Sequence, residues 1–73
     1  MEVRKDKLNI LGSRISSERR KKGLTLEKLA YGAGLSKGNL SDIENGKKDP
    51  RYSTLLTIAE GLDTSISKLL KDL

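Results

Sequence analysis

Apolar residues recur every three or four positions along most of the chain, which is the spacing of one face of an α-helix. The first such face has four members, namely Leu8, Leu11, Ile15 and the aliphatic stem of Arg19. Asn9 is a candidate N-cap for this helix, and the basic run before Gly23 suits its C-terminal end. Residues 1–7 show no such spacing, and we expect them to form a flexible N-terminal arm.

Two short helices are predicted next. Thr25 is a suitable N-cap for the first of them, and Gly34 ends it after about two turns. Ser36 is a suitable N-cap for the second, which we expect to run over residues 37–45 before Gly46. The inward positions of the pair are Leu26, Leu29, Ala30, Ala33, Leu40 and Ile43.

A fourth helix is predicted over about residues 52–61, and a fifth over residues 66–72 with Ser65 as its cap. Their inward positions are Leu55, Ile58, Ala59, Leu62, Ile66, Leu69 and Leu70. No segment shows sustained alternation of apolar and polar residues, so no strand is expected. The pattern predicts an all-α protein in which residues 8–73 form a single compact domain of five helices.

Composition limits the chemistry that such a domain can perform. The chain has no Cys and no His, which removes disulfides, the usual zinc ligand sets and the commonest general base. No cluster of acids and bases points to a catalytic pocket, so we expect no enzymatic activity, metal, cofactor or small-molecule ligand. Without an 18-residue apolar run or a signal peptide, we expect no membrane association and a cytoplasmic location.

The positive charge is concentrated in the middle of the chain. Residues 19–51 hold nine basic and four acidic side chains, and this excess equals the net charge of the whole protein, +5. The flanking segments contribute +1 and −1. Such a distribution is typical of a surface that binds a polyanion, although a solvated lysine-rich face would produce it as well.

The two central helices have the spacing of a helix-turn-helix, in which a short turn containing Gly joins two helices. Ala30 would lie where the helices cross, and Gly34 would adopt the positive φ of the turn. Packing of the inner face leaves the opposite face of helix 37–45 uncovered. Its exposed residues are Lys37, Gly38, Asn39, Ser41, Asp42 and Asn45, which would contact DNA if this is a helix-turn-helix of the DNA-binding kind.

These segments together resemble one family. The matching stretches, in order and at family spacing, are 23–30, 34–36, 40–46, 50–51, 55–59 and 67–70. Over about residues 8–71 the chain resembles the lambda-repressor-like (Cro/C1-type, XRE-like) helix-turn-helix DNA-binding family. The resemblance implies a regulator such as a phage-type repressor or a restriction–modification controller, with double-stranded DNA as its partner.

The resemblance also implies roles for individual residues. Positions matching those that face base edges or adjacent phosphates are Ser36, Lys37, Gly38, Ser41 and Asp42, and positions matching backbone contacts are Thr25, Leu26, Asn45, Lys47, Lys48 and Arg51. Arg19 and Glu44 match a partly buried ion pair. Three departures concern the target sequence: Leu26 replaces the usual Gln, Gly38 replaces a frequent base-contacting side chain, and Asp42 could accept a hydrogen bond from a cytosine amino group.

The same resemblance implies a homodimer on a near-palindromic operator. The C-terminal helix would form the interface, with Ile66, Leu69 and Leu73 between the subunits. The alternative is a protein-interaction module or antitoxin of the same fold with reduced DNA binding. The concentration of charge at residues 19–51 favours the DNA-binding interpretation, because an interaction module does not need it.

Overall fold

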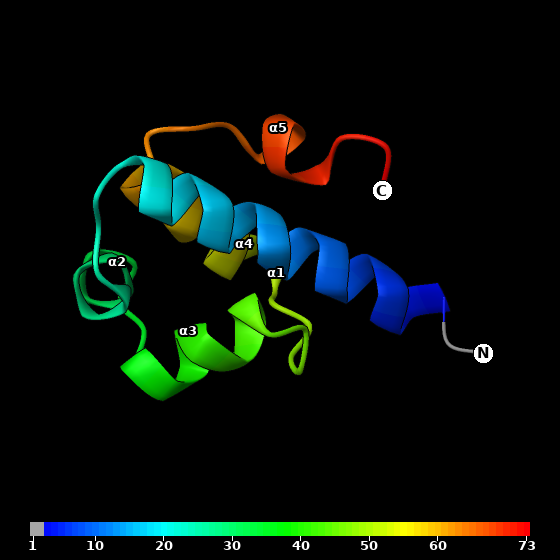
Figure 1. The fold of residues 1–73 in the computed structure, drawn as a ribbon, viewed down its shortest axis with the longest axis horizontal. Helices are drawn as coiled ribbons and strands as arrows, with labels where there is room; N and C mark the ends of the chain where they lie inside the picture. Colours follow the sequence, from blue (N-terminus) through cyan, green and yellow to red (C-terminus); the bar gives the residue numbers. More distant parts are fainter. Residues whose placement is uncertain (1–2) are drawn as a thin grey trace.

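The structure is a computed structural model that describes residues 3–73, and these residues form five helices and no strand (Figure 1). The helices are α1 (Val3–Lys21), α2 (Leu26–Gly32), α3 (Lys37–Glu44), α4 (Tyr52–Gly61) and α5 (Ile66–Leu70). The prediction of an all-α, five-helix fold is confirmed. None of these helices is both long and apolar enough to span a bilayer.

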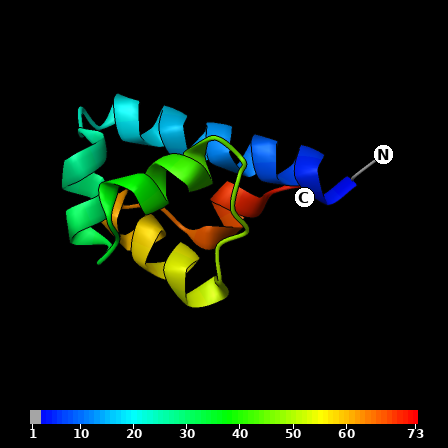
Figure 2. The ribbon, with the colours of Figure 1, turned by 90° about the horizontal axis from the view of Figure 1, so that it is seen from below.

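The long helix α1 organises the other elements. It packs against α3 on one side and against α5 on the other, while α2 packs against both α3 and α4 (Figure 1). Seen from below, α3 is on the outside of the molecule and α1 and α4 flank it (Figure 2). This arrangement leaves one side of α3 without a covering element.

One apolar cluster forms the core, and every helix contributes to it. Its buried members are Leu11, Ile15, Leu29, Ala30, Ala33, Leu40, Ile43, Leu55, Ile58, Ala59, Leu62 and Leu69. These are the inward positions that the three-and-four spacing predicts for the five helices, apart from Leu8, Leu26, Ile66 and Leu70, which are only half-buried. The core therefore follows from the periodicity of the sequence.

Four of the helices end in the same hydrogen-bonded turn. At the end of α3 the Gly46 N–H donates to the Ile43 carbonyl (3.1 Å), and the Lys47 N–H donates to the Asp42 carbonyl (2.8 Å). Gly46 adopts φ 73°, the left-handed conformation that this motif requires. In α4 the corresponding residue is Asp63, with φ 55°. Such ends turn the chain sharply, which keeps the connections short.

The first helix begins earlier than predicted. Residues 3–7 belong to α1, so the expectation of a flexible arm is wrong for them, and residues 1–2 lie outside the described part of the chain. The segment is polar but contains Lys and Arg, which favour helix, and Asp6 in its first turn suits the positive end of the helix dipole. Asn9 is therefore no N-cap: it lies within α1, where its side chain covers Gly46.

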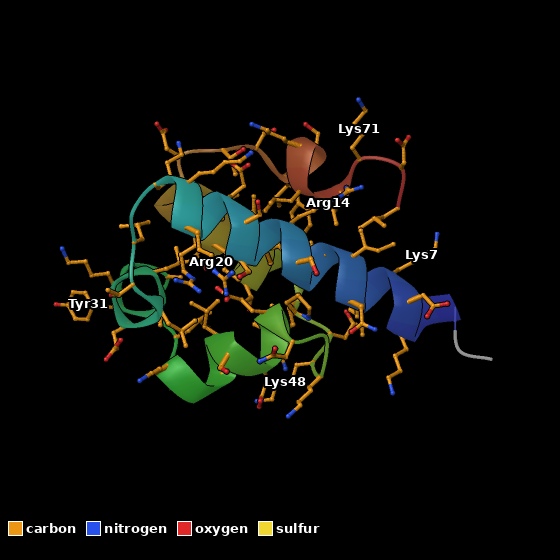
Figure 3. The ribbon with its side chains drawn as sticks, in the orientation of Figure 1. Lys7, Arg14, Arg20, Tyr31, Lys48 and Lys71 are labelled. Atoms are coloured by element: carbon orange, nitrogen blue, oxygen red, sulfur yellow. The ribbon has the colours of Figure 1, made fainter. Side chains whose placement is uncertain are left out.

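The last helix ends earlier than predicted, at Leu70 rather than at residue 72. The Arg14 guanidinium, from α1, donates to the carbonyls of Leu69 (3.0 Å) and Lys71 (2.6 Å). Figure 3 shows Arg14 and Lys71 on the side of α1 that faces α5. A side chain of another helix thus satisfies the last carbonyl groups of α5.

Candidate nucleic-acid interface

The helix-turn-helix pair is built from two capped helices. The Thr25 hydroxyl accepts a hydrogen bond from the Lys28 N–H (3.1 Å), and the Ser36 hydroxyl accepts one from the Asn39 N–H (3.1 Å). Between them Gly34 has φ 71°, as the turn requires. The two capping bonds fix where α2 and α3 begin, and the turn at Gly34 fixes where α2 ends.

Burial of Leu40 and Ile43 determines which face of α3 is presented outward. On that outward side Ser36, Lys37, Gly38 and Asn45 are exposed, and Asn39, Ser41 and Asp42 are half-buried. The structure therefore brings the residues of this helix and its N-cap that are expected to contact DNA onto one surface. The Asn45 amide is already used within the helix, because its nitrogen donates to the Ser41 carbonyl (2.9 Å).

The residues expected to hold phosphate surround this surface. Thr25, Lys47, Lys48 and Arg51 are exposed. Leu26 is half-buried and packs against the core, so its side chain is largely committed to folding. Arg51 occupies the N-cap position of α4 and makes no capping bond through its side chain.

An ion pair fixes the C-terminal end of α3 against α1. Arg19 donates from Nε to Glu44 Oε2 (2.8 Å) and from Nη2 to Glu44 Oε1 (3.1 Å), and Nη1 donates to the Leu24 carbonyl (2.9 Å). The two side chains are 13% and 8% exposed. Hydrogen bonding to Glu44 raises the pKa of the Arg19 guanidinium above its ordinary value, so the guanidinium stays charged.

A close approach of backbones accompanies the ion pair, and the sequence analysis missed it. Gly12 lies on α1 directly against the last turn of α3, where an added Cβ would lie 2.6 Å from the Ile43 carbonyl oxygen. Only glycine fits at this crossing without displacing α3. The one signal in the sequence is a glycine inside an otherwise good helix-forming segment.

The structure also shows contacts between charged groups that the sequence analysis did not anticipate. Lys48 Nζ donates to Asn39 Oδ1 (3.2 Å) and lies 4.0 Å from Asp42 Oδ2. Lys37 Nζ lies 3.6 Å from Glu27 Oε2, on α2. Two of the cations expected to contact DNA are therefore already close to polar groups of the same surface.

The expectation for Leu69 needs correction. The residue is 1% exposed, because it packs into the core between α1 and α4 rather than facing outward. Ile66 and Leu73 are half-buried: they pack against the edge of the core and remain partly accessible. Leu69 is therefore a core residue and cannot offer its side chain to a second subunit.

The comparisons with known proteins agree with this geometry. The family model described as helix-turn-helix matches residues 15–69. A curated relative, an uncharacterized HTH-type transcriptional regulator of Sinorhizobium fredii, is 36% identical over 89% of this chain and 84% of its own length. The immunity repressor protein of Bacillus phage phi105 is 37% identical over 82% of this chain, which spans only 42% of that protein.

A solved structure is similar as well. The restriction-modification controller protein C.AhdI from Aeromonas hydrophila superposes with a TM-score of 0.83 at 31% identity, over 85% of this chain and 94% of that one. The family model covers most of the chain, from α1 to α5. The chain therefore belongs to the helix-turn-helix family of the Cro/C1 type.

Proposed function

We propose that this protein is a sequence-specific transcriptional regulator that inserts α3 into the major groove of DNA. The observation that carries the proposal is the division of α3 into two faces: Leu40 and Ile43 are buried, and the opposite face is polar and uncovered. A single helix presented in this way is how helix-turn-helix proteins contact base edges. The similar proteins support the same function, because they are named as transcriptional regulators, a repressor and a controller.

The cations of this surface would supply most of the affinity. Lys37, Lys47, Lys48 and Arg51 lie along α3 and the loop that follows it. Basic side chains at such positions neutralise phosphates and release the counterions condensed on DNA. The polar residues of α3 would then distinguish one sequence from another.

Operator binding is expected to weaken steeply as the salt concentration rises. If about three cations per subunit neutralise phosphate, a dimer should give a slope of about −5 for log affinity against log salt. The measurement is a titration of a selected operator duplex at several salt concentrations. A slope near zero would contradict DNA binding and would favour an interaction module of the same fold.

We further propose that the protein acts as a homodimer on a near-palindromic operator, because one short helix contacts only a few base pairs. The half-buried Ile66 and Leu73 support an interface at the C-terminal end of the chain. Leu73 also lines an apolar groove together with Leu8 and Leu70. A second subunit that covers these side chains would remove apolar surface from water.

Ile66→Arg is expected to convert the dimer into a monomer and to reduce operator affinity, because it places a charge in an apolar contact. Ser67→Arg is the matched control, since it adds the same charge at an exposed position of α5. Analytical ultracentrifugation measures the mass of each variant, and circular dichroism verifies the helices. A wild-type protein that remains monomeric at high micromolar concentration would refute the dimer.

A further inference from the structure

Three side chains of different chemistry converge on the outer surface of α3. Asn39 and Asp42 are three positions apart, so they lie on the same side of the helix, one turn from each other. Lys48 comes from the loop between α3 and α4, and its ammonium reaches both of them, at 3.2 Å from Asn39 Oδ1 and 4.0 Å from Asp42 Oδ2. Figure 3 shows Lys48 beside α3. We call these three residues the α3 cluster.

The backbone directs Lys48 toward this position. The left-handed Gly46 and the hydrogen bond from the Lys47 N–H to the Asp42 carbonyl reverse the chain immediately after α3. The Asn9 side chain packs over Gly46 from α1 and limits how the turn can move. The loop thus returns Lys48 along the helix instead of extending it away from the domain.

The contact with Lys48 fixes the orientation of the Asn39 amide. An ammonium group can only donate, so the amide must present its oxygen to Lys48. The two N–H donors of the amide then point away from Lys48. The ammonium of Lys48 contacts both of the other groups. In space, the α3 cluster therefore presents its groups in the order amide donor, ammonium donor and carboxylate acceptor.

This order of groups complements one base pair in the major groove. A G·C pair presents two acceptors, guanine N7 and O6, followed by a donor, the cytosine amino group. An A·T pair presents an acceptor, a donor and an acceptor, so its central adenine amino group would oppose the ammonium of Lys48. We propose that the α3 cluster recognises a G·C base pair in each half-site, with Lys48 as a specificity-determining residue.

This inference rests on the proposed function, and it assigns Lys48 a different role from the phosphate contact expected from the sequence. Stability does not explain the cluster, because the side chains of Lys48 and Asp42 are 53% and 42% exposed. Ion pairs that exposed contribute little to folding. The charge on Lys48 has instead a direct consequence for recognition, since it compensates the Asp42 carboxylate near the phosphates of DNA.

The test compares sequence preferences rather than affinity alone. The full chain first selects binders from duplexes with a randomised centre, and single base-pair variants of the selected duplex are then titrated. The variants are Lys48→Met, Asn39→Ala and Asp42→Ala, with Lys47→Met as the matched control. Met keeps the aliphatic stem and removes the charge, and Lys47 is the exposed neighbour of Lys48.

We expect the wild type to prefer G·C at one position of each half-site by at least about fivefold, the lower end of what a good base contact provides. All three cluster variants should lose this preference at the same position, whereas Lys47→Met should keep it and bind all duplexes more weakly. If Lys48→Met instead keeps the full preference and resembles Lys47→Met, the inference is wrong and DNA binding stands. A wild type that selects no sequence would overturn the proposed function itself.

Discussion

Arg19→Ala is expected to destabilise the protein by about 3 kcal/mol, because breaking a largely buried ion pair leaves the other charge without compensation. Glu44 is 8% exposed and would lose both of its bonds to the guanidinium, and the Leu24 carbonyl would lose a donor. A chain of this size has a total stability of roughly 4–11 kcal/mol, so the loss is a large fraction of it. Thermal and urea unfolding measure the change.

Two controls distinguish the effect of losing the ion pair on stability from the effect of removing an arginine in general. Arg20→Ala removes the exposed neighbouring guanidinium and should change stability by less than about 0.5 kcal/mol. The double variant Arg19→Met with Glu44→Leu should recover most of the loss, since apolar replacement of a whole buried pair is often neutral. Equal stability of Arg19→Ala and Arg20→Ala would show that the pair does not hold α3 in place.

Gly12→Ala is expected to be almost as damaging, although alanine favours helix. The new Cβ would lie 2.6 Å from the Ile43 carbonyl oxygen and 2.8 Å from the Glu44 carbonyl carbon. Both are backbone atoms that no rotamer change can move aside, so α1 and α3 must separate. Overpacking of this kind costs about 1–3 kcal/mol, and we expect the upper end, with Tm lower by roughly 10 °C or more.

Gly32→Ala is the matched control for this substitution. Gly32 also lies in a helix, but an added Cβ there meets no atom within 4 Å. The exchange should therefore be neutral or stabilise the protein by up to about 1 kcal/mol, through helix propensity alone. If Gly12→Ala were as stable as Gly32→Ala, the close crossing of α1 and α3 would be disproved.

Features of the fold that depend on neighbours along the chain could be predicted from the sequence. The hydroxyls of Thr25 and Ser36 cap helices by accepting a hydrogen bond from the N–H three positions later. Gly34 and Gly46 end helices through their own left-handed conformation. Each of these effects operates within one turn, where the sequence pattern is sufficient. The outward face of α3 could be predicted in the same way, from the spacing of its buried residues.

Features that depend on how helices cross could not be predicted. The stripe of apolar residues on α5 fits either the core or a partner, and only the position of α1 shows that Leu69 belongs to the core. The need for glycine at Gly12 arises from a crossing with α3 that is distant in sequence. The return of Lys48 to Asn39 depends likewise on the path of a loop.

The packing of α1 against two helices has a consequence for the geometry of an operator. On one side α1 fixes α3 through Arg19 and Gly12, and on the other it fixes α5 through Arg14. In a dimer joined at its C-terminal ends, the separation of the two recognition helices would be set by this rigid connection inside each subunit. The number of base pairs between half-sites would then be as strictly specified as the bases themselves.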